Sequence, residues 1–222
     1  MIPRLHLITD DSILSRPGFL SQASRAIQAG GEQMAFHLRG HGVSGRAIYE
    51  AAEALEKACR RADGVLLVND RLDVVLALDL LGAHLSQRSL PPSVARELLG
   101  FERVLGLSVH SGEEGEAGRE GGMDFFLVGT LFDTPSHPGR VPGGVGRLTE
   151  IAATGPPPMI GIGGITPERV HEVMAAGAHG VAVRGGVWNL PDPAEAVGVY
   201  LGEVNRCSGQ TGGKENGEDG ER

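Results

Sequence analysis

Short apolar segments alternate with amphipathic segments along almost the whole chain. We expect the apolar segments to form strands at 5–9, 34–38, 65–69, 82–86, 104–109, 125–129, 159–163 and 180–184. Strands that alternate with helices are typical of parallel βα units, and eight strands are the number that a closed barrel needs. The pattern therefore predicts an α/β protein with a single-domain (β/α)8 TIM barrel.

Residues that start and stop helices support this division. Gly30 stands where a helix needs a C-terminal stop, and Asn69-Asp70 is a good N-cap pair for the helix that follows. Thr166 followed by Pro167 gives the N-cap and first position of another helix. The expected helices with such signals or a helical period cover 21–29, 45–62, 71–81, 167–176 and a last segment from 193 to about 204.

The end of the chain differs in composition from the rest. From Cys207 it reads CSGQTGGKENGEDGER, in which Cys207 is the only apolar residue. Such a segment cannot bury enough apolar surface to offset the entropy of ordering. The 222 residues fit one barrel. We therefore predict a barrel domain over residues 1–206 and a disordered tail over 207–222.

Charge and cysteine content exclude several classes of protein. The net charge of −8 and the pI near 5.5 argue against a general nucleic-acid binder. We expect neither a signal peptide nor a membrane span, because the N-terminus leads directly into a strand and no apolar run has the length of a span. Cys59 and Cys207 give no disulfide framework, so a cytoplasmic protein is expected.

Two glycine-ended strands near the C-terminus carry the strongest functional signal. Residues 160–165 read IGIGGI, and residues 180–186 read GVAVRGG. Glycines at a strand end leave backbone N–H groups uncovered, and barrels build phosphate pockets after their seventh and eighth strands. The alternative is that the glycines only allow tight turns. We favour a pocket for a small phosphorylated ligand, because both runs fall at the same phase of consecutive βα units.

Polar residues follow the other strands, at the end where a barrel has its active site. Arg39 could pair with a phosphate or carboxylate, or form a salt bridge to Asp10 or Asp70. Asp70 could hold Mg²⁺ or cap the next helix. Both alternatives stay open for each residue.

Histidines are prominent among these polar residues. Those inside strands are expected to be neutral and hydrogen-bonded to a neighbour, whereas those beyond strand ends are candidates for contact with a ligand. Their spacing does not favour a structural zinc site. The first group is His37 and His84, and the second is His41, His110 and His137.

Seven stretches, in this order and spacing, resemble the thiamine phosphate synthase/TenI superfamily over residues 4–204. They are 5–12 (LHLITDDS), 36–39 (FHLR), 68–71 (VNDR), 84–87 (HLSQ), 106–111 (GLSVHS), 129–134 (GTLFDT) and 162–169 (IGGITPER). The resemblance implies a (β/α)8 barrel that binds a thiazole phosphate. It implies that this phosphate lies on the backbone around Gly163, Gly164, Arg184 and Gly185.

The synthase branch of this superfamily joins a pyrimidine pyrophosphate to thiazole phosphate with Mg²⁺. The resemblance places the pyrimidine pyrophosphate and its metal at Arg39, Asn69, Asp70 and Ser108, and further substrate contacts at Thr130 and Thr134. Three positions differ from the synthase pattern. Two lysines are His41 and His137 here, and a second Mg²⁺-binding acid is Ser89.

These differences lead us to expect the TenI-like branch, a thiazole tautomerase that moves a proton without a metal. The TenI histidine after the sixth strand is Thr130 here, so His137 or His41 would transfer the proton. Arg39 would orient the carboxylate, and Ser108 is a further candidate catalytic residue. The alternatives are a Mg²⁺-dependent synthase that uses Asp70, and a non-catalytic binder of thiazole or thiamine phosphate. A homodimer is possible in each case.

Overall fold

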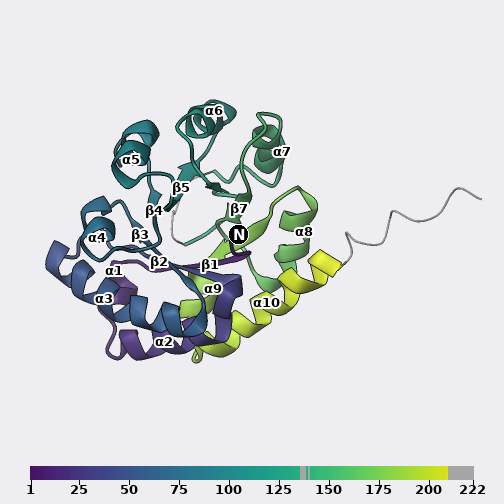
Figure 1. Cartoon of the computed structure of the whole chain (residues 1–222). Coiled ribbons are helices and arrows are strands. Elements are labelled where there is room, and N and C mark those ends of the chain that lie inside the picture. Colours follow the sequence, from purple (N-terminus) through teal and green to yellow (C-terminus); the bar gives the residue numbers. More distant parts are fainter. Residues whose placement is uncertain (136–138, 140, 210–222) are drawn as a thin grey trace, which may run out of the picture.

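Eight parallel strands close into a barrel in the computed structural model, which describes residues 1–135, 139 and 141–209 (Figure 1). Neighbouring strands pair in sequence order, and β8 pairs with β1. The predicted single-domain (β/α)8 barrel is confirmed. Every strand begins at its predicted residue and ends within one residue of its predicted end. The strands are β1 (Leu5–Ile8), β2 (Met34–Leu38), β3 (Val65–Asn69), β4 (Gly82–Leu85), β5 (Val104–Val109), β6 (Phe125–Gly129), β7 (Met159–Ile162) and β8 (Gly180–Val183).

Helices surround the strands and cover the barrel on the outside (Figure 1). The α-helices are α1 (Asp11–Leu14), α2 (Phe19–Gly30), α3 (Gly45–Ala62), α4 (Leu72–Ala77), α5 (Pro92–Leu99), α6 (Gly112–Glu120), α7 (Gly146–Ala152), α8 (Val170–Ala175), α9 (Gly185–Trp188) and α10 (Pro193–Gly209). Two 3-10 turns, η1 (Gly31–Gln33) and η2 (Pro167–Arg169), precede β2 and α8. Helix α10 packs against α2 and α8, so the last helix closes the ring beside the first long one.

Helix α3 illustrates why these segments fold as they do. Its buried face comes from residues spaced three and four apart, including Ile48, Ala52 and Leu55, which lie against the barrel. The side chain of Ser44 caps its start by accepting a hydrogen bond from the backbone N–H of Ala47. Replacing the fully buried Leu55 by alanine is expected to cost about 2–5 kcal/mol of stability.

Two helix predictions differ from the structure. The segment predicted over 71–81 is helical only in α4, and Asp70 does not cap it. Instead, Asp70 has a left-handed backbone with φ of 60°, and its Oδ1 accepts a hydrogen bond from the backbone N–H of Ser86 at 2.7 Å. The N-cap alternative for Asp70 is therefore wrong, because its carboxylate is held by the next βα unit.

The last helix is longer than predicted. Helix α10 continues to Gly209, beyond the expected end near residue 204. Its buried side chains Val197, Tyr200 and Val204 continue the apolar face along the helix. The predicted tail over 207–222 lies mostly outside the described residues, so its disorder stays a prediction.

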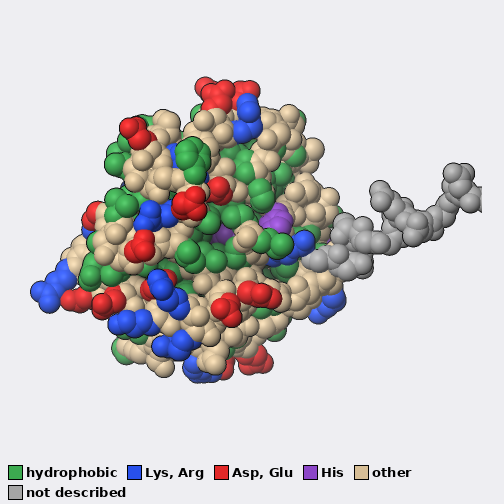
Figure 2. Space-filling view, viewed as in Figure 1, with side chains coloured by type: hydrophobic (Ala, Val, Ile, Leu, Met, Phe, Trp, Pro, Cys, Tyr) green, Lys and Arg blue, Asp and Glu red, His purple; other side chains and the backbone are tan. Residues whose placement is uncertain are grey.

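The N-terminal segment closes one end of the barrel. Ile2 packs against the core inside the strands, and its carbonyl accepts a hydrogen bond from His179 at 2.9 Å. Figure 2 shows this face, with apolar side chains near its centre and charged side chains of both signs spread over the surrounding helices. A cavity of about 400 Å³ lies at the same end, where Arg4 and His179 precede β1 and β8. Within the described ranges, no helix is long and apolar enough to span a membrane.

Candidate functional site

All eight strands point the same way, so the residues that follow them meet at one end of the barrel. This end, the barrel mouth, carries the predicted site residues that lie in the described part of the chain. They fall into two groups. The glycine half is Gly163 and Gly164 after β7, with Gly185 and Gly186 after β8. The polar half is Arg39, Asn69, Asp70 and Ser108, at the ends of β2, β3 and β5.

The two glycines after β7 combine a left-handed backbone with close packing. Gly163 and Gly164 both have positive φ, at 104° and 64°. A Cβ on Gly163 would lie 2.5 Å from Cγ2 of Thr130, and a Cβ on Gly164 would lie 2.3 Å from the carbonyl oxygen of Asp133. The chain therefore needs glycine at both positions for its conformation and for close packing against the loop after β6.

Two side chains hold this glycine backbone in place. Nη1 of Arg169 donates to the carbonyl of Gly164 at 2.7 Å, and the Arg169 guanidinium lies 4.4 Å from the centre of the Phe132 ring. The hydroxyl of Tyr200, on α10, donates to the carbonyl of Ile165 at 2.9 Å. The half therefore presents a rigid backbone surface, which suits the binding of a phosphate by N–H groups.

Arg184 forms an ion pair that connects β8 with β1. Its Nη1 lies 2.6 Å from Oδ2 of Asp10. Burial by itself would raise the pKa of Asp10. Hydrogen bonds from the Ser12 hydroxyl and the Ile13 N–H, and the charge of Arg184, outweigh burial and lower the pKa of this carboxyl. Asp10 is therefore ionised at neutral pH. The sequence offered Asp10 as a partner for Arg39, but the structure pairs it with Arg184.

Arg39 is anchored by its backbone and leaves its guanidinium in the mouth. The Thr9 hydroxyl accepts from the N–H of Arg39 at 2.8 Å and donates to its carbonyl at 3.0 Å. Burial and the positive charge of Arg184 lower the pKa of Arg39, while the carboxylates at positions 10, 11 and 70 act in the opposite direction. Among residues 1–135, 139 and 141–209, no carboxylate forms an ion pair with Arg39. A partly buried cation beside a second cation is suited to an anionic ligand.

Asp70 can provide one metal-binding oxygen. Its Oδ1 accepts from the N–H of Ser86, which leaves Oδ2 for another partner. Within the described residues, no group of three or more His, Cys, Asp or Glu side chains could hold a metal ion by itself. Mg²⁺ is commonly bound by one or two carboxylates together with substrate phosphates and water. One carboxylate beside Arg39 therefore fits Mg²⁺ only when a phosphorylated substrate completes the site.

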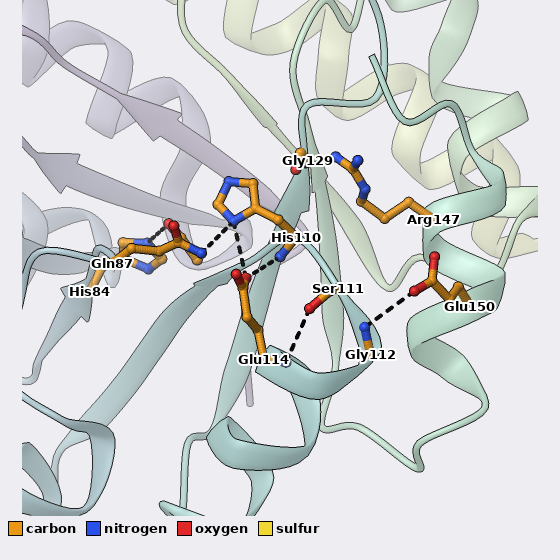
Figure 3. Close-up of polar contacts among 10 residues, drawn as sticks. His84, Gln87, His110, Ser111, Gly112, Glu114, Gly129, Arg147 and Glu150 are labelled. Atoms are coloured by element: carbon orange, nitrogen blue, oxygen red, sulfur yellow. Dashed lines mark hydrogen bonds and ion pairs between the residues drawn. The ribbon is translucent and has the colours of Figure 1, made fainter. Parts of the chain in front are cut away.

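Ser108 is held by an imidazole from the neighbouring strand. Nε2 of His84 lies 2.9 Å from Oγ of Ser108. Beyond them, His110 joins Gln87 and Glu114 in a network at the ends of β4 and β5 (Figure 3). The sequence analysis did not identify Glu114, which lies in the first turn of α6, four residues after His110.

Of the two predicted bases for proton transfer, only His41 lies among the described residues. His41 is exposed in the loop after β2, and His137 lies outside the described residues. Thr130 is largely buried, and its carbonyl accepts from the N–H of Gly143 at 2.9 Å. Thr134 is half-buried in the same loop after β6. Neither threonine side chain can act as a base near neutral pH.

Comparisons with known proteins agree on the family of this chain. The family described as "Thiamine monophosphate synthase" matches residues 5–187. A thiamine-phosphate synthase of Roseiflexus castenholzii is 39% identical over 193 residues, which cover 86% of this chain and 84% of that protein. The "Thiamine biosynthesis bifunctional protein ThiM/ThiE" of Symbiobacterium thermophilum is 41% identical over 162 residues, 72% of this chain but 34% of that longer protein.

A solved structure gives the same result. A thiamine phosphate pyrophosphorylase from Pyrococcus furiosus superimposes with a TM-score of 0.79 at 27% identity. The alignment covers 92% of this chain and 96% of that chain. The likeness therefore extends over the whole barrel.

The expectation of a TenI-like, metal-independent tautomerase is wrong, because relatives at 37–39% identity over most of the chain are named thiamine-phosphate synthase. The error has a physical reason. The residues at positions 41, 89 and 137 lack one acid and two lysines of the synthase pattern, which favours the TenI-like branch when charges alone are compared. Yet Asp70 and Arg39 remain in the mouth with a second guanidinium close to Arg39. From the family match over residues 5–187 and the identity with its members, this chain belongs to the thiamine monophosphate synthase family.

Proposed function

We propose that this protein is a thiamine phosphate synthase, which condenses hydroxymethylpyrimidine pyrophosphate with thiazole phosphate in the presence of Mg²⁺. The observation that carries the proposal is the 39% identity with a thiamine-phosphate synthase over 86% of the chain. The two halves of the barrel mouth support it, because the reaction brings together two ligands that each carry phosphate.

The thiazole phosphate is proposed to bind in the glycine half. Backbone N–H groups of Gly163, Gly164 and Gly185 would donate to its oxygens, with the Arg184 guanidinium adding charge. A backbone fixed by Arg169 loses little entropy when it binds the ligand. The thiazole ring would then extend over the mouth toward the polar half.

The pyrimidine pyrophosphate is proposed to bind in the polar half. In the reaction, the thiazole nitrogen forms a bond with the exocyclic carbon of the pyrimidine while the bond from that carbon to the pyrophosphate oxygen breaks. The electron pair of the broken bond leaves with pyrophosphate. The polar half therefore has to stabilise negative charge that develops on a leaving group.

Each polar residue has a distinct part in this step. Arg39 would donate to the leaving pyrophosphate, and Asn69 and Ser108 would hold the pyrimidine ring in line with the attacking nitrogen. Mg²⁺, when bound by Asp70 and the pyrophosphate, neutralises charge on the leaving group. Burial and Arg184 lower the pKa of Arg39, but a guanidinium stays protonated near neutral pH, so its charge is available for the leaving group.

The three differences from the synthase pattern are compatible with this proposal. Relative to the synthase pattern, His41 replaces a lysine and Ser89 replaces an acid in the polar half. His137 replaces a second lysine, in the segment that follows β6 in the sequence. Arg184 is near enough to Arg39 to lower its pKa, so the mouth keeps two guanidiniums. The expected consequence is a higher Mg²⁺ requirement than in a relative with two acids.

The test is a condensation assay with the purified protein. Hydroxymethylpyrimidine pyrophosphate, thiazole phosphate and Mg²⁺ are incubated with the chain, and thiamine phosphate and pyrophosphate are both quantified. The proposal predicts that the two products appear in equal amounts and that EDTA abolishes both. Absence of thiamine phosphate under conditions in which the Roseiflexus synthase makes it would overturn the proposal.

A further inference from the structure

Helix α5 carries apolar side chains on two opposite faces. Ala95 and Leu99 are buried against the rest of the protein. On the outward face, Val94 and Leu98 lie one turn apart, with exposed fractions of 39% and 51%. A helix on the surface of a globular protein normally presents polar side chains to water on its outward face. The outward face of α5 therefore has the composition of a contact surface.

Other helices of the ring show the usual pattern. In α3, the exposed side chains of Arg46 and Glu50 form an ion pair, and so do those of Lys57 and Glu53. Helix α6, which follows α5 in the ring (Figure 1), exposes charged residues such as Glu116. Apolar side chains on the outward face are thus not a general property of the helices that cover this barrel.

The apolar surface extends beyond both ends of α5 and onto α4. Leu90, just before α5, and Phe101, just after it, have exposed fractions of 46% and 84%. Helix α4 packs against α5, and Leu76 and Leu81 on and after α4 are 45% and 52% exposed. We call this set the α5 surface, and its members are Leu76, Leu81, Leu90, Val94, Leu98 and Phe101.

The α5 surface is large for a protein that would stay a monomer. It contains half of the large apolar side chains that are exposed in the described part of the chain. At about 150 Å² for each side chain when fully exposed, the six fractions leave on the order of 500 Å² in contact with water. This area is near the upper end of the range of roughly 300–600 Å² for the largest apolar patch of a monomer.

Phe101 has a fixed support beneath its ring. The guanidinium of Arg96 lies 5.4 Å from the centre of that ring. Arg96 is itself buried and donates hydrogen bonds to the carbonyls of Gly122 and Gly100 and to the carboxylate of Asp124. An aromatic side chain on a rigid support loses little entropy when a partner covers it, which is typical of the residues that dominate binding energy in protein interfaces.

Opposite charges stand at the two ends of the α5 surface. Helix α5 runs from the mouth back to the closed end of the barrel, because it connects the end of β4 with the start of β5. Arg88 is exposed before the helix, and Glu102 is exposed after it. Neither takes part in an ion pair within the described ranges of the chain. The surface is therefore positive at one end and negative at the other.

This charge pattern matches a second copy that runs in the opposite direction. A two-fold axis across α5 near residues 95 and 96 would place Val94 opposite Leu98 of the second copy. The same axis would place Leu90 opposite Phe101, and Arg88 opposite Glu102, at both ends of the contact. A parallel arrangement would instead bring like charges together, which is unfavourable.

We propose that the α5 surface binds a second copy of this chain, with the two α5 helices antiparallel about a two-fold axis. A standard interface buries about 800 Å² per partner, so the apolar side chains supply its core and the charged residues around them its rim. The proposal does not depend on the proposed function, since it uses no residue of the barrel mouth.

The first test is the mass of the protein in solution, measured by light scattering over a dilution series. The unchanged protein is expected at about twice the chain mass of 23.2 kDa. Leu98→Glu places a charge in the middle of the apolar contact and should raise the dissociation constant of the dimer at least about 10-fold. Because Leu98 is half exposed, the variant should keep the circular dichroism spectrum of the unchanged protein.

Val199→Glu is the matched control. Val199 lies on α10 with an exposed fraction of 49%, so the substitution adds the same charge at a similar exposure away from α5. It should leave the dimer intact. An unchanged protein that is monomeric at all concentrations would overturn the proposal and leave the surface to another segment or another protein. A dimer that Leu98→Glu does not weaken, or that Val199→Glu weakens equally, would also overturn it.

The second test examines the antiparallel arrangement by exchanging charges. Arg88→Glu and Glu102→Arg should each weaken the dimer about three- to tenfold, because each places like charges opposite one another. The double variant restores opposite charges and should return to within about twofold of the unchanged protein. A double variant that is weakened by the product of the two single effects would contradict the antiparallel arrangement.

Activity measurements keep this proposal separate from the proposed function. Leu98 lies in the last turn of α5, toward the closed end of the barrel, so Leu98→Glu should keep kcat per chain within about twofold. A monomeric protein that forms thiamine phosphate would support the synthase and overturn the dimer. A dimer that dissociates in Leu98→Glu but forms no thiamine phosphate would do the reverse.

Discussion

The two halves of the barrel mouth achieve binding by different physical means. In the glycine half, the backbone itself forms the surface, and the side chains of Arg169 and Tyr200 hold it from behind. In the polar half, side chains such as Arg39 and Asp70 project from strand ends, and their charges determine what can bind. A binding surface made of backbone tolerates few amino-acid substitutions. In a binding surface made of side chains, a single substitution can change one charge and leave the rest of the surface intact.

This contrast explains where the sequence departs from the synthase pattern. His41 and Ser89 follow the strands of the polar half, whereas the third departure, His137, lies outside the described residues. Gly163 and Gly164 could not be replaced without contacts shorter than 3 Å.

The largest effect is expected from Gly164→Ala, which breaks the glycine half. The new Cβ would lie 2.3 Å from the carbonyl of Asp133 on a backbone with φ of 64°, so the strand end must shift. Misplacement of a phosphate by about 1 Å costs on the order of 100-fold, and we expect kcat/KM for thiazole phosphate to fall by at least that factor. Steady-state kinetics with each substrate varied in turn measures it.

Gly155→Ala is the matched control for this variant. Gly155 has nearly the same backbone conformation, with φ of 66°, but an added Cβ would meet nothing within 4 Å. It should lose about 1 kcal/mol of stability from backbone strain and keep its activity. If both variants lose activity alike, strain rather than the shape of the mouth is responsible.

Asp70→Asn breaks the polar half and is expected to have the second largest effect. The asparagine can keep the hydrogen bond from the N–H of Ser86 and tolerates the left-handed backbone, so only the charge is lost. We expect kcat to fall about 100-fold and the Mg²⁺ concentration for half-maximal rate to rise. Asp63→Asn, at a residue with φ of 55° after α3, is the control and should leave both quantities unchanged.

The third prediction concerns the interior that both halves share. Burial, and then the charges of His6 and Arg39, lower the pKa of His84 to about 3. Between pH 6.5 and about 3, the unfolded chain therefore binds a proton at this position that the folded protein does not. Above pH 6.5 neither state binds this proton, so the two states do not differ. As the pH falls below 6.5, each such buried histidine lowers the free energy of unfolding by about 1.4 kcal/mol per pH unit.

Denaturant unfolding at a series of pH values tests this effect. The unchanged protein should lose stability more steeply below pH 6.5 than His84→Gln, which has no proton to bind. Since His6 and His37 are shifted in the same direction, part of the slope should remain in the variant. Identical slopes would mean that His84 is charged in the folded protein or has access to water.

The smallest effect is expected from Ser89→Asp, which adds a carboxylate to the polar half at the position where the synthase pattern has an acid. Ser89 is half-buried in the turn after β4, where its N–H donates to the carbonyl of Ser86. A second carboxylate near Asp70 should lower the Mg²⁺ requirement about two- to fivefold. Ser93→Asp, exposed in the first turn of α5, adds the same charge elsewhere and should not. An equal effect in both variants would indicate a general effect of charge.

The fold could be predicted closely from the sequence, because apolar strands and helix signals recur with the period of the barrel. The glycine half could be located too, since two glycine runs after consecutive strands have few structural alternatives. The choice between the two branches of the family could not be predicted. Counting charges at His41, Ser89 and His137 overlooked that Arg184 lies close to Arg39, a proximity that depends on how β8 and β1 close the barrel.

The contacts inside the barrel were also beyond sequence analysis. His37 and His84 could be predicted as neutral imidazoles with a neighbour, and each has one. The link from Pro3 through His6 to His37 could not be predicted, because it depends on where the N-terminal segment crosses the closed end of the barrel. Contacts between residues far apart in the chain become visible only when strand register is known.

The most direct test of the account is a crossed kinetic measurement on three proteins. The KM values for thiazole phosphate and for pyrimidine pyrophosphate are determined in the unchanged protein, Gly164→Ala and Asp70→Asn, with thiamine phosphate as the measured product. The account predicts a crossed pattern, in which Gly164→Ala raises mainly the first KM and Asp70→Asn mainly the second. A protein that makes no thiamine phosphate, or variants that raise both KM values equally, would contradict the division of the mouth into two halves.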